Sequence, residues 1–307
     1  MQLRLAAVLA SAVALVSFAA GPSFGAAPQV TTYATVAPGV FGLAFAADGS
    51  LYASAGATVF KIAPGGSPVT TFVTGMVSSR GMVFDGSGNL YVADWGDNAS
   101  IPAKIWKVTP AGVKSVFATL ASPTGLAIDG SGNILAGQWG VHNVAKITPA
   151  GVVSNYATSI SGPTEEVGEL FYDSTTGDVY ATCETTIKKI GSGGSPVTTA
   201  VSGLVSCQYG MTRAPDGSFY LARYSHRDVY SVSPGGSVSL FAGAHLAQGC
   251  VDGPLLDARF SLPAFMIMSG TTLYIADAGC SAVRTIDLSG VVPTKASSWG
   301  RLKSIYH

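Results

Sequence analysis

Charged side chains are scarce in this chain. Asp, Glu, Lys and Arg make up 11% of the 307 residues, and 17 basic residues balance 17 acidic ones. Because this composition cannot form a strongly basic surface, we do not expect nucleic acid as a partner. The 4 cysteines form no CxxC pair, so the sequence does not indicate a cysteine-based metal site either.

A membrane-spanning run is absent beyond the first residues, since the longest later apolar run, residues 262–268, contains a proline. At the start of the chain, Arg4 precedes a largely apolar stretch over residues 5–20, and Gly21 and Pro22 then break it. With small residues at 25–27, this pattern is typical of a secretory signal peptide over residues 1–26. A retained anchor is the alternative, but the stretch is short for a span and ends in helix breakers. We therefore expect a secreted or periplasmic protein with no membrane span after cleavage.

One motif is repeated six times between residues 27 and 290. Its clearest copy runs from Arg80 to Asp94 and continues over residues 104–112. Asp-Gly or Gly-Asp turns come before the second predicted strand of five copies, and Gly-containing turns follow the third strand of all six, which predicts short antiparallel strands. The copies are 39 to 54 residues apart when aligned on Tyr52, Tyr91, Leu135, Tyr180, Tyr220 and Tyr274. This period is typical of four-stranded propeller blades.

Only five copies have a fourth strand after the third. These strands are expected at residues 69–73, 114–119, 153–158, 197–201 and 237–242. In the sixth copy Pro293 would interrupt such a strand, whereas residues 29–35 share the pattern of residues 153–158. The prediction is therefore an all-β, six-bladed β-propeller of four-stranded antiparallel blades over residues 27–290, closed by the N-terminal strand. Residues 291–307 are expected to be a C-terminal tail of unknown role.

Several stretches resemble the NHL repeat. They are residues 123–129 with Gly132-Asn133, residues 90–94 with 104–108, and residues 253–263 with the preceding Asp252. NHL-type rings serve as interaction platforms, as sensor domains and as scaffolds of lactonases and lyases, so the resemblance implies a fold but no single function. Related scaffolds are the gluconolactonase-like and virginiamycin B lyase-like propellers. The metal-binding triad of the gluconolactonase-like enzymes is not visible here, because Phe41, Thr124 and Tyr209 stand at the blade entrances.

Export would favour disulfide formation. In the repeat register Cys183 ends a second strand and Cys207 precedes the next first strand, while Cys250 and Cys280 hold similar positions around the sixth copy. We predict the pairs Cys183–Cys207 and Cys250–Cys280, each worth about 3 kcal/mol in the chain-entropy model. Free buried thiols are the alternative.

First-strand starts and second-strand ends should meet at one face of the ring, which is the predicted site. The candidate binding residues there are Arg80, Asp94, Trp95, Gln138, Trp139, Glu165, Glu166, Tyr209, Arg223, Tyr224 and Asp277. The candidate catalytic residues are His142 and His226, in corresponding loops of two blades. Each candidate also has a structural alternative: Asp94 and Asp277 can hold the next loop through its amides, and the tryptophans can pack between loops.

The function predicted from these features is an exported binding or interaction module for a small molecule, peptide or protein, and we expect a monomer. The first alternative is a metal-assisted lactone hydrolase or lyase. There Asp94, Glu166 or Asp277 would hold a divalent cation, and His142 or His226 would move a proton. The second alternative is an envelope scaffold. The sequence assigns no other cofactor.

Overall fold

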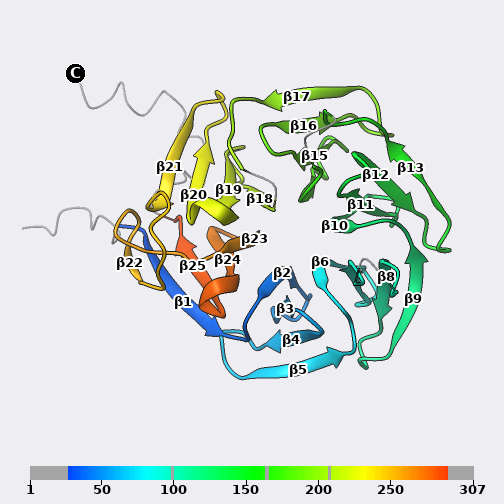
Figure 1. Ribbon diagram of the computed structural model, residues 1–307, viewed down its shortest axis with the longest axis horizontal. Helices are drawn as coiled ribbons and strands as arrows, with labels where there is room; N and C mark the ends of the chain where they lie inside the picture. The colour runs from blue at the N-terminus through cyan, green and yellow to red at the C-terminus, as the bar shows by residue number, and fades with distance from the viewer. Residues whose placement is uncertain (1–26, 98–99, 163–165, 207–208, 290–307) are drawn as a thin grey trace, which may run out of the picture.

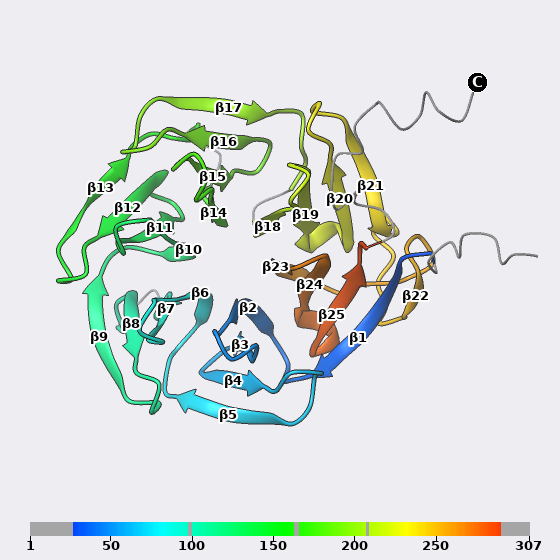
Figure 2. The same ribbon diagram turned by 180° about the vertical axis from the view of Figure 1, so that it is seen from behind.

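Six antiparallel blades surround a central axis in the structure, a computed structural model that describes residues 27–97, 100–162, 166–206 and 209–289. Each blade has four strands, and the sheet of the sixth carries a short fifth strand at its edge. Figure 1 looks along this axis, and Figure 2 shows the same ring from behind. In each blade the first strand lies nearest the axis and the fourth lies at the rim (Figure 1). The predicted six-bladed β-propeller is confirmed, and the described residues add only two short 3-10 turns, η1 (Tyr224–His226) and η2 (Ala278–Cys280).

Blades one to five follow the chain in order. Blade one contains β2 (Val40–Phe45), β3 (Leu51–Ala55), β4 (Thr58–Ile62) and β5 (Val69–Thr74). Blade two contains β6 (Ser79–Phe84), β7 (Leu90–Asp94), β8 (Lys104–Val108) and β9 (Lys114–Thr119). Blade three contains β10 (Pro123–Ile128), β11 (Ile134–Gln138), β12 (Asn143–Ile147) and β13 (Val153–Ala157). Blade four contains β14 (Leu170–Tyr172), β15 (Val179–Thr182), β16 (Ile187–Ile190) and β17 (Val197–Val201), and blade five contains β18 (Gly210–Arg213), β19 (Phe219–Arg223), β20 (Asp228–Val232) and β21 (Val238–Gly243).

Blade six is closed by the N-terminal strand, as predicted. It combines β23 (Pro263–Ser269), β24 (Thr272–Asp277) and β25 (Ala282–Asp287) with β1 (Gln29–Thr35), which is antiparallel to β25 with Thr31 opposite Thr285. A short strand, β22 (Gly253–Pro254), pairs with the other edge of β1. Figure 1 shows β1 in blue between β22 and the red end of the chain, so both ends of the propeller share one sheet.

The hydrophobic core lies between neighbouring blades. Second strands such as β3, β7 and β11 are buried along their whole length because a blade packs on each of their faces. Fourth strands such as β13 are mostly exposed at the rim. The ring therefore buries most of its apolar surface between neighbouring blades rather than in one central core.

Glycine recurs at one position of the first strands, where blades approach most closely. At Gly42 an added Cβ would lie 2.0 Å from the Arg80 carbonyl oxygen of the next blade, and Gly210 meets the Ala264 carbonyl in the same way. Gly81 and Gly125 occupy the corresponding places in blades two and three. The strand registers place Glu169 and Phe265 at this position in blades four and six.

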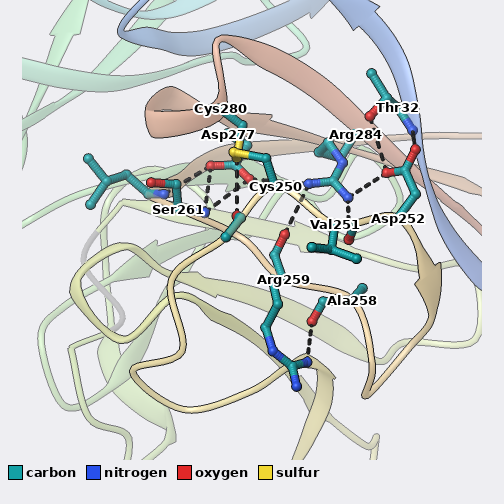
Figure 3. Close-up of polar contacts among 12 residues, drawn as sticks. Thr32, Cys250, Val251, Asp252, Ala258, Arg259, Ser261, Asp277, Cys280 and Arg284 are labelled. Atoms are coloured by element: carbon teal, nitrogen blue, oxygen red, sulfur yellow. Dashed lines mark hydrogen bonds and ion pairs between the residues drawn. A yellow bond between two sulfur atoms is a disulfide. The ribbon is translucent and has the colours of Figure 1, made fainter.

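Arg284 connects the closing strand to the long loop before β23 (Figure 3). Its fully buried guanidinium donates to the Val251 carbonyl at 2.8 Å, to the Arg259 carbonyl at 3.2 Å and to Asp252 Oδ1 at 2.5 Å. The Asp252 carboxylate in turn accepts hydrogen bonds from the amide and hydroxyl of Thr32 in β1. One buried arginine thus ties the loop and the N-terminal strand together.

The disulfide Cys250–Cys280 is present as predicted, and it fixes the same loop to η2 (Figure 3). Cys183 is buried, but Cys207 lies outside the described residues, so the pairing of these two cysteines stays a prediction. The proposed signal peptide and residues 291–307 also lie outside the described residues. Within the described part of the chain, no helix is long and apolar enough to span a membrane.

Candidate functional site

The strand registers place the blade entrances and the second-strand ends on one face of the ring. First-strand starts lie opposite second-strand ends, as in Ser79 with Asp94 and Pro263 with Asp277. We call this side the upper face, and the side where first strands end the lower face. The prediction that entrances and second-strand ends share one face is confirmed by these pairings.

Aromatic side chains from five blades gather around the axis at the upper face. The Tyr209 ring stacks on Trp139, with centroids 5.3 Å apart and an interplanar angle of 6°. It also makes an edge contact with Phe41 at 5.3 Å. The complete aromatic cluster comprises Phe41, Trp95, Trp139, Tyr209, Tyr224 and Phe265. Trp95, Trp139, Tyr209 and Tyr224 are among the binding residues predicted from the sequence, whereas Phe41 and Phe265 are not.

Arg80 lies within this cluster. Its guanidinium carbon lies 4.2 Å from the Phe41 ring centroid and 4.4 Å from that of Trp95, distances typical of cation–π contacts. No described residue forms an ion pair or a side-chain hydrogen bond with it, and its Nε is buried without an acceptor. Burial lowers the pKa of Arg80, an effect that Tyr209 and Tyr224 oppose, yet a guanidinium stays protonated at physiological pH. The upper face therefore presents a cation that lies between aromatic rings and has no ion-pair partner among the described residues.

Several polar groups accompany the aromatic cluster. The Nε1–H of Trp95 is also buried without an acceptor among the described residues. Glu166 accepts a hydrogen bond from the Gly140 amide, which fixes the entrance of blade four to the neighbouring loop. Burial raises the pKa of the Tyr209 hydroxyl, and the Glu166 charge adds to this shift while Arg80 opposes it. Gln138 donates through its side-chain amide to the Ala121 carbonyl at 3.2 Å.

Asp94 is fully buried, and its carboxylate is hydrogen-bonded to neighbouring residues of the protein. Its carboxylate accepts hydrogen bonds from the Ser78 amide at 2.8 Å, the Val77 amide at 3.1 Å, the Gly96 amide at 3.2 Å and Trp106 Nε1 at 2.9 Å. Burial alone would raise its pKa, but these donors together hold the pKa below the ordinary value. This geometry matches the structural alternative, in which the aspartate holds the loop before the next first strand.

Asp277 holds the corresponding loop of blade six (Figure 3). It accepts hydrogen bonds from the amides of Ser261 and Leu262 at 3.1 and 2.9 Å, and its Oδ2 lies 3.5 Å from Arg284 Nη1. Burial raises the pKa of Asp277, with these partners opposing the shift. Both aspartates are 0% exposed, so neither offers an oxygen to a ligand at the upper face.

Arg223 is engaged in an ion pair rather than open to solvent. Its guanidinium makes two hydrogen bonds of 2.7 Å to the two oxygens of Asp228, which is fully buried. His245 Nδ1 lies 3.2 Å from Arg223 Nη2, and its ring stacks on His226 at 4.9 Å. Burial first, and then the neighbouring Arg223 and His245, lower the pKa of His226, so this histidine is neutral near pH 7.

The two candidate catalytic histidines have separate surroundings. His142 Nδ1 lies 3.2 Å from the Ser161 hydroxyl in blade three, whereas His226 contacts His245 in blade five. Among the described residues, no hydrogen bond or ring contact joins His142 to His226. Glu165 lies outside the described residues. No group of three or more His, Cys, Asp or Glu side chains in the described ranges is arranged to hold a metal ion.

A second cavity was not predicted from the sequence. It has a volume of about 920 Å³ and opens at the lower face, where turns such as 173–176 and 214–217 line it. Glu169 lines it from within the channel, 7% exposed. The signal in the sequence was an acidic residue at the position where four other first strands carry glycine.

No protein-family model matches the sequence, and no curated protein matches it. The NHL assignment therefore rests on the repeat pattern alone.

Solved structures do match the fold. An auxiliary nutrient binding protein from Bacteroides thetaiotaomicron superposes with a TM-score of 0.72 and 15% identity, covering 84% of this chain and 76% of that chain. Virginiamycin B lyase from Staphylococcus aureus gives a TM-score of 0.60 and 14% identity, covering 85% and 99%. A gluconolactonase from Xanthomonas campestris gives 0.63 and 14%, covering 85% and 89%. At these identities the likeness establishes a six-bladed β-propeller, a fold that binding proteins and enzymes share.

Proposed function

We propose that this protein is an exported binding module whose upper face takes a small molecule carrying a carboxylate beside an apolar or aromatic group. The observation that carries the proposal is Arg80, a protonated guanidinium held between two aromatic rings with no ion-pair partner among the described residues.

The geometry around Arg80 suits a planar anion. Only its Nε is buried without an acceptor, so the two Nη groups reach solvent and can donate in parallel to a carboxylate. Rings that hold the guanidinium in place reduce the entropy lost on binding. The Trp95 Nε1–H is a second donor without an acceptor close by, and the exposed parts of Trp139 and Tyr209 supply apolar surface.

Binding is favoured over the metal-assisted alternative by the state of the carboxylates. The carboxylate oxygens of Asp94 and Asp277 accept hydrogen bonds from backbone amides, and Glu166 accepts one from the Gly140 amide. Two of the structural neighbours are described as auxiliary nutrient binding proteins, which is consistent with a binding role on this fold. The Cys250–Cys280 disulfide and the predicted signal peptide support a location outside the cytoplasm.

The test is a calorimetric titration with phenylacetate and with phenylacetamide, which has the same shape without the charge. We expect phenylacetate to bind the protein more tightly than phenylacetamide. Arg80→Gln should lower the affinity for phenylacetate by about ten- to a hundredfold, which is the loss expected for a charged hydrogen-bond pair of about 1.5–3 kcal/mol. Arg80→Lys should fall between, because lysine keeps the charge but not the planar fork.

Lys146→Gln is the matched control. It removes one positive charge from β12, in a third strand away from the upper face, and should leave both affinities unchanged. Equal binding of phenylacetate and phenylacetamide, or binding that survives in Arg80→Gln, would contradict the proposal, and no binding of either compound would favour the scaffold alternative.

A further inference from the structure

The lower half of the central channel has the size of a ligand site. Its volume of about 920 Å³ lies within the range of roughly 300–1,000 Å³ found for small-molecule pockets. Residues of all six first strands line it, so it belongs to the ring as a whole and not to one loop. Phe265 borders the cavity and also contacts Phe41 of the upper aromatic cluster, at 5.2 Å between ring centroids. This ring stands between the lower cavity and the upper face.

The part of the cavity that the first strands form is largely apolar. Four of the chain's 6 methionines contribute to the lining, together with Leu43, Leu126 and Leu170. These methionines are Met82, Met211, Met266 and Met268. Met82, Met211 and Met266 also pack in the buried clusters between blades, so the apolar lining is continuous with those clusters and suits the alkyl part of a ligand.

Glu169 supplies the deep polar group. The residue is 7% exposed, and its Oε1 accepts a hydrogen bond of 3.2 Å from the Leu170 amide. Its Oε2 is buried with no hydrogen-bond partner among the described residues, and Glu169 is part of the cavity lining. A buried oxygen without a hydrogen-bond donor lowers the stability of the folded protein by about 1–3 kcal/mol, and a ligand that supplies a donor would remove this cost. Burial also raises the pKa of Glu169 well above its ordinary value.

The charges at the cavity mouth favour a cation. Arg213 is neutralised by Asp173, with 2.6 Å between Nη1 and Oδ2. Asp216 adds a carboxylate whose hydrogen bonds within the described residues come from the amide and hydroxyl of Ser218 in the same turn. The lining therefore contains three acidic residues and one basic residue.

We propose that the lower channel binds a small organic cation, an amine with an apolar body, and that Glu169 is the carboxylate that receives its ammonium group. The apolar part lies against the methionine and leucine walls. This site is on the opposite side of Phe265 from Arg80, so it extends the proposed function and does not depend on it.

The test is a titration of the whole protein with hexylammonium and, separately, with neutral hexanol. We expect hexylammonium to bind at one equivalent and more tightly than hexanol. Glu169→Gln keeps the size of the side chain and the acceptor for the Leu170 amide but cannot carry the negative charge. It should weaken hexylammonium about tenfold or more and leave hexanol unchanged.

A second variant tests the location without touching the carboxylate. Val83→Phe narrows the same cavity with the residue that blade four carries at this register position, Phe171. It should weaken the binding of both hexylammonium and hexanol, while Lys146→Gln should change neither affinity. No binding of hexylammonium, or binding that is unchanged in Glu169→Gln and in Val83→Phe, would overturn the proposal. Phenylacetate binding at the upper face is measured separately, so either proposal can fail alone.

Discussion

Three buried carboxyl groups show how nearby hydrogen-bond donors shift the pKa of a side chain. Asp94 accepts hydrogen bonds from three amides and an indole, and its pKa is lowered in spite of burial. Asp277, at the same position in blade six, has fewer donors and a raised pKa. Glu169 has a single backbone donor, and burial raises its pKa well above the ordinary value. Only this last group keeps an oxygen for an external partner.

The raised pKa of Glu169 predicts a pH-dependent stability difference. Below about pH 4.3, the ordinary value for glutamate, folded and unfolded chains both hold the proton. As pH rises, the unfolded state loses the proton first, so the free energy of unfolding falls until the folded-state pKa is reached. Glu169→Gln removes this fall, because glutamine does not titrate.

Chemical denaturation of both proteins across this pH range measures the effect. Other carboxyl groups titrate alike in the two proteins, so their contribution cancels in the difference. We expect the variant to gain stability relative to the natural protein as pH rises. A difference that stays constant with pH would contradict a raised pKa of the buried Glu169 carboxyl group.

At the scale of elements, the long loop before β23 is the main departure from a regular blade. Its backbone bonds to Arg284, its Asp252 holds β1, and its Cys250 is linked to Cys280 in η2. The loop therefore acts on ring closure through two strands that are distant in sequence.

Removing the disulfide should weaken this element. The link closes a separation of 30 residues, for which the chain-entropy model gives about 3–4 kcal/mol. We expect the double substitution Cys250→Ser with Cys280→Ser to lower the free energy of unfolding by about that amount in urea denaturation. An unchanged midpoint would show that the Arg284 contacts alone hold the loop.

The repeat pattern predicted much of the fold and part of the site. Strand positions, ring closure and the shared face follow from periodicity and from antiparallel order, which the sequence displays directly. The partners of Asp94 and Arg223 do not, since they depend on loop conformation and on contacts such as Asp228 across a turn. The lower cavity was missed because side chains from six separated strands form it. Glu169 in a column of glycines was the available signal.

At the scale of the whole molecule, β1 joins the two ends of the propeller in one sheet. Val30 is 0% exposed and packs in the core of blade six with residues such as Ile275 and Ile286. Val30→Asp would bury an unpaired charge there, which costs roughly 3–5 kcal/mol. We expect a single denaturation transition at lower denaturant, with aggregation through the exposed edge of β25.

Thr35→Asp is the control for this substitution, because Thr35 is an exposed residue of the same strand. It should leave the transition almost unchanged. Equal effects of the two variants would argue that β1 does not close the ring through its buried face.

We propose above that the upper face binds carboxylates through Arg80. A crystal structure of the protein with para-bromophenylacetate would test this binding site, since anomalous scattering locates the bromine independently of the rest of the ligand. We expect the carboxylate on the Arg80 guanidinium and the bromine beside Trp95, Trp139 or Tyr209. Bromine in the lower cavity or on the outer strands, with nothing bound at Arg80, would contradict it.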